Sequence, residues 1–517
     1  MSSPISNIMA GTATKYALLA VNIGLGVVLM PFTVRHLGTA QYGLWMLVAS
    51  LTYYFQLLDL GYGSGLVRHV ADADARGDVD GVNRTLSTFV IVYAALGLVA
   101  AAGTLALMLW AVPRFPHLSA AEIRRAQLLL AMIGVRIAIG FPMTVFGAAT
   151  TARQRFALNN TVAIVVALAN GAITYAVLAT GHGLLTLVAC TTALGIASYA
   201  GYAWTARRAF PELRIRPSSF SRALVRDVTT FSVYLFVIDL AVQIGFNLDN
   251  VVVGAALGTS AVAVYAVTLR LADYQRQLCN QFNGFLFPLI VRLRASESLD
   301  ALQVMLIEGT RIALILVTGV TIGVIGWGRP LLMRWMGPAF EAGVVPLYVL
   351  ALTGVVLVGQ GPLGNILLGT GRHRLVALVS LGEALANLVL SLLLVRRFGL
   401  LGVALGTAVP IALANLFILL PAACRQVRLP IQQFLRLVLP APVIGAMPAI
   451  IVCVILRTWW PPESWPAILA EGATAGLVYL GTACTLGCNR EVRARYAAYA
   501  RQILSSTRPR RTVEAAS

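Results

Sequence analysis

Apolar runs of about twenty residues recur along the whole of this 517-residue chain. A helix of that length is what is needed to cross the hydrocarbon core of a bilayer. Composition agrees, because 58% of the residues are hydrophobic and only 11% are charged, whereas a soluble domain carries about 25% charge. Lipid offers the backbone no hydrogen-bond partners, so the runs must form helices. The sequence therefore predicts an all-α polytopic membrane protein.

The runs predict about fourteen transmembrane helices. We place them roughly at 16–34, 43–66, 86–112, 126–149, 158–179, 184–204, 228–255, 262–290, 311–328, 345–369, 375–395, 399–421, 434–456 and 466–488. The opening MSSPISNIMAGTATK lacks the basic start of a cleavable signal, and the first apolar run is long enough to stay in the membrane.

The net charge of +19 raises the possibility of a nucleic-acid partner, but the basic residues follow the topology. With the N-terminus in the cytoplasm, most of the 39 Lys and Arg residues fall in cytoplasmic connections, above all in 207–227 and after Cys488. The positive-inside rule therefore predicts that both termini are cytoplasmic. We expect the protein to lie in the plasma (inner) membrane. We interpret the basic tail as attracted to anionic lipid and expect no nucleic-acid partner.

Four short motifs occur in the same order in both halves of the chain. They are Leu-Gly-Thr at 37–39 and 257–259, Arg-x-Arg at 153–155 and 372–374, Ala-Leu-Ala-Asn at 167–170 and 384–387, and Gly-Leu-Leu at 183–185 and 399–401. The offset drifts only from 220 to 216 residues. Ordered matches with so steady an offset indicate an internal duplication.

Each copy would hold six spans, an even number, so both copies enter the membrane from the same side. This predicts two parallel six-helix lobes, 1–213 and 214–425, around a central cavity where substrate is handled. Two further helices follow in 426–490, and 491–517 forms the basic cytoplasmic tail. Lobes arranged in this way commonly work by alternating access, which favours a transporter.

Three segments resemble a known family. They are HLGTAQYGLWMLVASLTYYFQLLDLGYGSGLVRHVADADARGD at 36–78, RWMGPAFEAGVVPLYVLALTGVVLVGQGPLGNILLGTGRHR at 334–374 and ANLVLSLLLVRRFGLLGVALGTAVP at 386–410. They are similar to bacterial oligosaccharide flippases of the multidrug/oligosaccharidyl-lipid/polysaccharide (MOP) exporter superfamily. The resemblance covers about residues 10–425. It implies export of undecaprenyl-pyrophosphate-linked oligosaccharide from the cytoplasmic to the periplasmic leaflet, for O-antigen, capsule or exopolysaccharide.

Charged side chains inside the spans are the candidate site residues, because a charge at mid-bilayer costs several kcal/mol unless it faces a cavity or a partner. Arg136 lies halfway along the fourth span, and Arg270 and Arg276 lie on the polar eighth span with Asp273. Guanidinium groups bind phosphate oxygens in a fork, so we predict that these arginines hold the pyrophosphate. The alternative is an internal ion pair, such as Arg270 with Asp273.

Four carboxylates also fall in apolar surroundings: Asp59, Asp239, Asp249 and Glu383. A carboxylic acid in an apolar cavity can hold a proton near neutral pH. We predict that these residues couple transport to protons or sodium, the alternative being a helix–helix hydrogen bond or an arginine partner. Asn247 could recognise sugar hydroxyls, and Tyr274 could stack on a sugar ring or simply fill a helix interface.

Three rival functions remain. A drug or cation antiporter of the same superfamily would need an acidic, aromatic cavity, which three intramembrane arginines do not favour. A membrane polysaccharide polymerase or ligase would need a large external loop, whereas the longest here have about a dozen residues. A receptor or scaffold leaves the eighth span unexplained, because we expect its polar face to line water or the other lobe. We find no catalytic, cofactor or metal motif and predict no enzyme activity; other polysaccharide-assembly proteins are possible partners.

Overall fold

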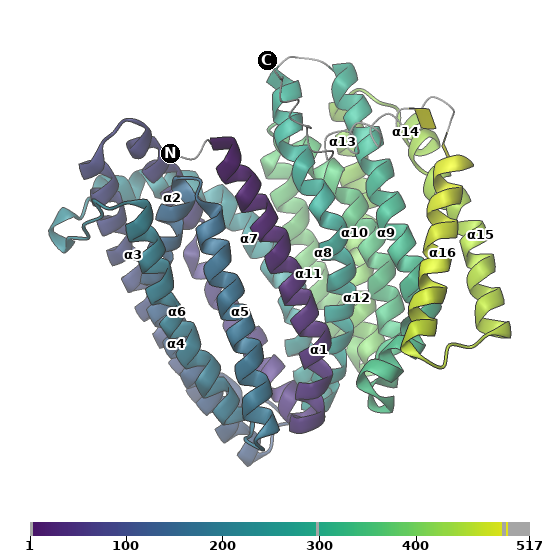
Figure 1. Cartoon of the computed structure of the whole chain (residues 1–517), viewed down its shortest axis with the longest axis horizontal. Helices are drawn as coiled ribbons and strands as arrows, with labels where there is room; N and C mark the ends of the chain where they lie inside the picture. Colours follow the sequence, from purple (N-terminus) through teal and green to yellow (C-terminus); the bar gives the residue numbers. More distant parts are fainter. Residues whose placement is uncertain (1–3, 296–298, 489–492, 495–517) are drawn as a thin grey trace, which may run out of the picture. The chain divides into compact units, whose positions relative to one another are not determined.

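The computed structural model describes residues 4–295, 299–488 and 493–494, and the side chains of these except 4–6, 8–9, 230–247, 281–282 and 284–295. The described residues form helices and connections without a strand. The first eight α-helices are α1 (Pro4–Tyr53), α2 (Tyr62–Ala75), α3 (Val79–Ala106), α4 (Ala120–Ala152), α5 (Phe156–Ala179), α6 (Leu184–Ala209), α7 (Arg222–Leu257) and α8 (Thr259–Ala295) (Figure 1). The others are α9 (Leu299–Met336), α10 (Val344–Gly369), α11 (His373–Phe398), α12 (Leu400–Ala414), α13 (Leu420–Gln426), α14 (Ile431–Val438), α15 (Pro440–Trp459) and α16 (Trp465–Thr485).

The helices confirm the all-α membrane fold. Eleven helical segments of the described chain are long and apolar enough to cross a membrane. The first of them, Ala10–Ala75, contains the first two predicted spans, and α7 and α8 cover the seventh and eighth. The helices are consistent with about fourteen membrane crossings.

The chain forms two compact units. Unit 1 comprises 1–271, 335–349 and 373–411, and unit 2 comprises 272–334, 350–372 and 412–517. The chain therefore passes from one unit to the other inside several helices, for example within α8 and near the end of α9. The lobes predicted from the duplication follow a different division and stay a prediction.

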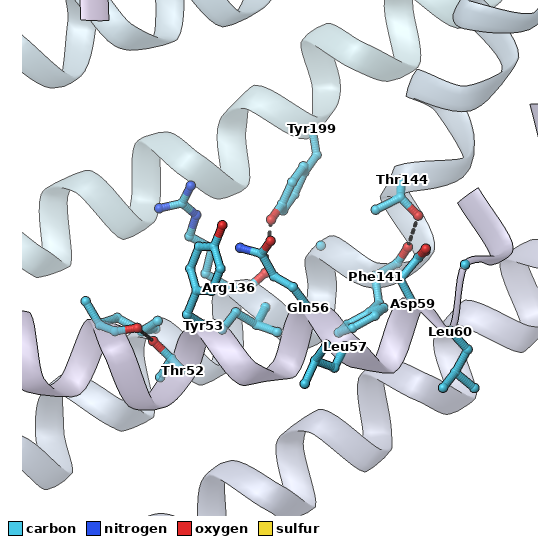
Figure 2. A pocket seen from close by; sticks show the side chains of 15 residues that line it. Thr52, Tyr53, Gln56, Leu57, Asp59, Leu60, Arg136, Phe141, Thr144 and Tyr199 are labelled. Carbon is cyan, nitrogen blue, oxygen red and sulfur yellow. Dashed lines mark hydrogen bonds between the residues drawn. The ribbon is translucent and has the colours of Figure 1, made fainter. Parts of the chain in front are cut away.

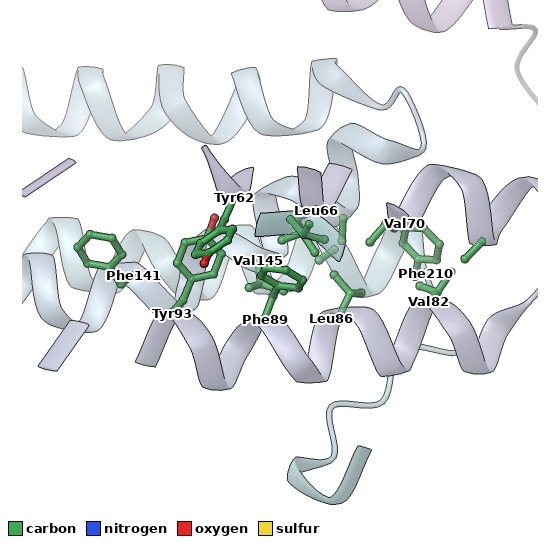
Figure 3. Packing of buried hydrophobic residues seen from close by; sticks show 14 of the residues in the cluster. Tyr62, Leu66, Val70, Val82, Leu86, Phe89, Tyr93, Phe141, Val145 and Phe210 are labelled. Atoms are coloured by element: carbon green, nitrogen blue, oxygen red, sulfur yellow. The ribbon is translucent and has the colours of Figure 1, made fainter. Parts of the chain in front are cut away.

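Within unit 1, α1 packs along α5, α4 packs against both α3 and α6, and α7 packs along α11. One core of this unit is centred on Leu66, Phe89, Tyr93 and Phe141 (Figure 3). Within unit 2, α15 packs against α16, and the side chains of Trp327 and Tyr479 are buried in the core beside them.

Both copies of the Leu-Gly-Thr motif mark the same backbone bend. Gly38, at the kink inside α1, has φ 77° and ψ 162°. Gly258, between α7 and α8, has φ 85° and ψ 177°. Only glycine adopts this region readily. The motif is repeated because the chain turns in the same way at two positions 220 residues apart.

The turns that contain the two Arg-x-Arg motifs have the same hydrogen-bonding pattern. Aligning the turns by this pattern, however, shifts the second motif by two residues relative to the alignment by letters. In the first, Gln154 N donates to Thr151 O and Arg155 N donates to Thr150 O; in the second, Gly371 N donates to Leu368 O and Arg372 N donates to Leu367 O. Both follow the hydrogen-bonding pattern that ends a helix with one left-handed residue, and the offset is 217 residues. Arg372 therefore corresponds to Arg155, which corrects the alignment of Arg372 with Arg153.

Both copies of Ala-Leu-Ala-Asn agree with this register. The motif begins eleven residues after the first residue of α5 in one copy and eleven residues after the first residue of α11 in the other. The offset is again 217 residues, so the turn, the first residue of the helix and the motif all repeat at the same spacing in the two halves of the chain.

Two polar residues of α8 have a different role from the one predicted. We expected the polar face of the eighth span to line water or the other lobe. Gln275 is instead buried and donates to Thr321 Oγ1 of α9 at 2.7 Å and to Ala351 O of α10 at 3.1 Å. Asn283 is also buried and donates to Val358 O of α10 at 3.0 Å. These amides hold helices together, as polar groups do inside membranes.

Candidate functional site

A cavity of about 680 Å³ opens in unit 1 between α4, α6 and the segment that connects α1 to α2. Its polar lining residues are Thr52, Tyr53, Gln56, Asp59, Arg136, Thr144 and Tyr199. Figure 2 shows the side chains of Tyr53, Gln56, Arg136 and Tyr199 close to one another along the pocket wall. A polar pocket formed by membrane-spanning helices is the default candidate for a binding site.

A break in the second predicted span shapes one wall of this pocket. Helix α1 ends at Tyr53, a 3₁₀ segment covers Tyr54–Asp59, and Leu60 then adopts a left-handed conformation with φ 50°. A left-handed leucine is uncommon and costs energy, so the surrounding packing must hold it. Interrupted helices at membrane depth are tolerated where they line a cavity. The break therefore belongs to the pocket.

Asp59 holds the two sides of the break together. Its Oδ2 accepts a hydrogen bond from the backbone N–H of Gly63 in the first turn of α2 at 3.2 Å. Its Oδ1 accepts a hydrogen bond from the buried hydroxyl of Tyr93 on α3 at 2.6 Å. Asp59 thus has a clear structural role, and its predicted part in ion coupling stays a prediction.

Arg136 provides the positive charge of the pocket. Its guanidinium lies against Gly195 of α6, where the position of a Cβ would be 2.7 Å from Arg136 Cζ. Its backbone carbonyl accepts a hydrogen bond from the hydroxyl of Tyr199 at 3.0 Å. Among the described side chains, no carboxylate forms an ion pair with it. A guanidinium placed in this way can bind an anion that enters the pocket.

Sequence reasoning found Arg136 and Asp59 but missed Thr52, Gln56, Thr144 and Tyr199. The sequence pattern that could have identified them is a polar or aromatic residue on the same helix face as a charged residue. Gln56 lies three residues before Asp59, a spacing that brings side chains to one side of a helix. With Thr52, Tyr53 and Tyr199, it gives the pocket hydroxyl and amide groups that can hydrogen-bond to a sugar or to phosphate oxygens.

The two arginines of α8 differ from each other. Arg276 lies in unit 2 and forms an ion pair with Asp273, with 2.7 Å between Arg276 Nη2 and Asp273 Oδ1. Asp273, which we had considered as a partner of Arg270, thus pairs with Arg276. Arg270 is exposed at the end of the α8 segment in unit 1. Substrate binding by either arginine stays a prediction.

Asp249 of α7 has the most closed environment of the candidate carboxylates whose side chains the structure describes, with 1% exposure. Its Oδ2 accepts hydrogen bonds from Tyr265 of α8 at 2.7 Å and from Thr407 of α12 at 2.9 Å. Asn387 of α11 donates to Thr407 at 3.3 Å, and Ser391 donates to Asn387 at 2.9 Å. Three other helices, α8, α11 and α12, thus contribute oxygen-bearing groups around the carboxylate of α7.

The remaining predicted site residues are spread over the fold. Glu383 of α11 has a buried Oε1 with no hydrogen-bond partner among the described residues. Tyr274 of α8 is partly buried. Asp239 and Asn247 lie on α7, and their side chains fall outside the described part of the structure.

The contact between Gly195 and Arg136 leads to a prediction. Replacing Gly195 with Ala should lower transport about three- to tenfold and leave folding nearly unchanged. The new Cβ would overlap only the end of a flexible side chain, so Arg136 can move away. Thermal unfolding and transport of the purified protein test this. Gly147→Ala on α4 is the control, because its nearest neighbour is 4.0 Å away. Unchanged transport in Gly195→Ala would show that the position of Arg136 is unimportant.

Comparison with known proteins places this geometry in context. The profile of a family described as polysaccharide biosynthesis protein matches residues 10–294. An uncharacterized membrane protein of Bacillus subtilis (strain 168), EpsK, is 23% identical over 483 residues, covering 92% of this chain and 94% of EpsK.

Two solved structures show a similar fold. The lipid II flippase MurJ, in an inward closed conformation, matches with a TM-score of 0.72 at 13% identity, covering 96% of this chain and all of MurJ. An inward-facing multidrug resistance MATE family transporter of the MOP superfamily matches with a TM-score of 0.64 at 12% identity, covering 79% of this chain and 99% of the transporter. At these identities the similarity concerns the fold.

Proposed function

Because this chain belongs to the polysaccharide biosynthesis protein family, we propose that it is a flippase of the MOP superfamily that acts on undecaprenyl-pyrophosphate-linked oligosaccharide. It carries the oligosaccharide from the cytoplasmic to the periplasmic leaflet of the inner membrane by alternating access between two six-helix lobes. Both termini are cytoplasmic, and the protein catalyses no covalent chemistry.

The position of Arg136 is the observation that carries this proposal. A cation inside a membrane-spanning helix is costly unless it faces a cavity or a partner. Arg136 is exposed and lines a polar pocket, which suits a ligand that brings the negative charge. A pyrophosphate offers several oxygens to the fork of a guanidinium. The hydroxyl and amide groups of Thr52, Gln56 and Tyr199 suit the sugar hydroxyls attached to it. A cationic drug would meet a positive charge in the same pocket.

The network around Asp249 supports ion coupling. A carboxylate that is closed off from solvent and surrounded by hydroxyl and amide groups can either take up a proton or bind a hard cation through oxygen ligands. We propose that one of these ions drives transport, and that Asp249 is the main coupling residue among the four carboxylates considered.

Deleting the gene tests the proposed function in the cell. We expect surface or secreted polysaccharide to be lost while the lipid-linked precursor accumulates on the cytoplasmic leaflet, because synthesis continues without export. Lipid extraction with mass spectrometry and a polysaccharide assay measure both quantities, and a plasmid copy of the gene is the control. Normal polysaccharide together with altered resistance to cationic drugs would instead identify an antiporter.

A further inference from the structure

Several helices contain a proline in their interior, among them α1 with Pro31, α9 with Pro330 and α10 with Pro362. Proline has no backbone N–H, so the carbonyl four residues earlier loses its helical hydrogen bond. The three carbonyls concerned belong to Val27, Gly326 and Val358. In a membrane such a group needs another donor.

Each of these carbonyls receives a hydrogen bond from a side chain of another helix. Arg457 Nη1 of α15 donates to Gly326 O at 3.0 Å, and Asn283 Nδ2 of α8 donates to Val358 O at 3.0 Å; these bonds lie within unit 2. Trp335 Nε1, in the last turn of α9, donates to Val27 O at 2.7 Å. At each of these three prolines, the side-chain donor takes the place of the missing backbone N–H.

The Trp335 bond differs from the other two in what it connects. Its partners are 308 residues apart in the sequence, one at the start of the chain and one in its second half. The indole is buried, with 5% exposure. Trp335 is also the residue at which the chain enters unit 1, since Arg334 still belongs to unit 2. The bend of α1 is therefore attached to the end of a helix whose greater part lies in unit 2.

We propose that Trp335 is a positioning residue, whose indole N–H fixes the bend of α1 at Pro31 and links the position of α1 to that of the end of α9. When α9 moves, the donor to Val27 moves with it, and α1 must follow or lose a hydrogen bond that no backbone N–H can replace. The effect of this hydrogen bond on transport rests on the proposed function. Its effect on the conformation of α1 does not.

A double-mutant cycle of Trp335→Phe with Pro31→Ala tests this proposal. Trp335→Phe keeps an aromatic ring but removes the donor, and Pro31→Ala restores a backbone N–H that can reach Val27 O. We expect Trp335→Phe to lower transport about five- to tenfold, the usual worth of a hydrogen bond whose acceptor is left without a donor. In the Pro31→Ala background the same substitution should have no further effect.

The conformation of α1 is measured separately, by the distance between spin labels attached after Gly24→Cys and Gly183→Cys, with the six native cysteines replaced by alanine. Both sites lie in unit 1 and have no atom within 4 Å of an added Cβ. We expect Trp335→Phe to broaden or shift the distribution of distances between the two labels. In the Pro31→Ala background, the same substitution should leave this distribution unchanged. Trp327→Phe, which removes an indole donor to Glu471 in unit 2, is the control and should leave the distribution unchanged.

Two results would overturn the proposal. One is an unchanged distance distribution in Trp335→Phe; the other is an equal change with and without Pro31, which would mean that ring packing and not the hydrogen bond is responsible. If Trp335→Phe alone does not fold, the proposal requires that adding Pro31→Ala restores folding, and failure to do so contradicts it. Because the distances do not depend on the transported molecule, failure of the proposed function would leave this result standing.

Discussion

Arg136→Ala should reduce transport about 30-fold or more, because a hydrogen bond to a charged group is worth roughly this factor. Folding should suffer little, since the guanidinium forms no ion pair among the described side chains and the backbone carbonyl that binds Tyr199 is retained. Transport of lipid-linked oligosaccharide, normalised to the amount of folded protein, measures the effect. Arg136→Lys keeps the charge without the fork and should lose only part of the activity.

Matched variants separate this effect from a general loss of positive charge. Arg114→Ala removes an exposed arginine outside the pocket, one that donates to Trp110 O in its own segment, and should transport normally. The loss in Arg136→Ala should also persist whatever glycan is attached, because the pyrophosphate is common to all of them. If Arg136→Ala combined with Arg276→Ala still exported normally, the assignment of the pyrophosphate site would be wrong.

Asp249→Asn should abolish the dependence of transport on an imposed ion gradient and lower the rate about tenfold or more. Asparagine has nearly the same shape as aspartate, and its carbonyl oxygen can still accept hydrogen bonds from Tyr265 and Thr407. The asparagine amide cannot take up a proton near neutral pH, and it cannot supply the negative charge that a bound cation needs. Transport in vesicles with a proton gradient alone, or a sodium gradient alone, tests the prediction and identifies the ion.

The other carboxylates serve as comparisons for Asp249. Asp59→Asn should retain gradient dependence, since Asp59 is occupied with the backbone of α2 and the hydroxyl of Tyr93. Glu383→Gln and Asp239→Asn test the two remaining candidates in the same assay. Full gradient dependence in Asp249→Asn would mean that the buried network is structural.

The architecture followed from the sequence because hydropathy depends on local composition. Runs of apolar residues identified the membrane helices. The repeated Leu-Gly-Thr predicted a duplication, and the structure shows that it marks a backbone bend at both Gly38 and Gly258. The register of the Arg-x-Arg repeat was two residues in error, because the match of letters ignored where the left-handed residue ends each helix. Turn geometry, and not residue identity, fixes that register.

The side-chain environment could not be predicted, because it depends on residues far apart in the chain. Span eight is polar, but nothing local shows that Gln275 and Asn283 bind the backbone of α10 while Arg276 pairs with Asp273. Asp249 was identified as a candidate, yet its partners come from three other helices. The partner of the Val27 carbonyl is 308 residues away, beyond any local pattern.

Translocation by the purified protein tests the central claim most directly. Vesicles are loaded in one leaflet with a fluorescent undecaprenyl-pyrophosphate-linked oligosaccharide, and a membrane-impermeant reagent measures the fraction that reaches the other leaflet. We predict that the wild-type protein moves the lipid faster than protein-free vesicles do, and that Arg136→Ala does not. If wild-type vesicles show the same protected fraction as protein-free ones under both proton and sodium gradients, the protein is not a flippase for this lipid.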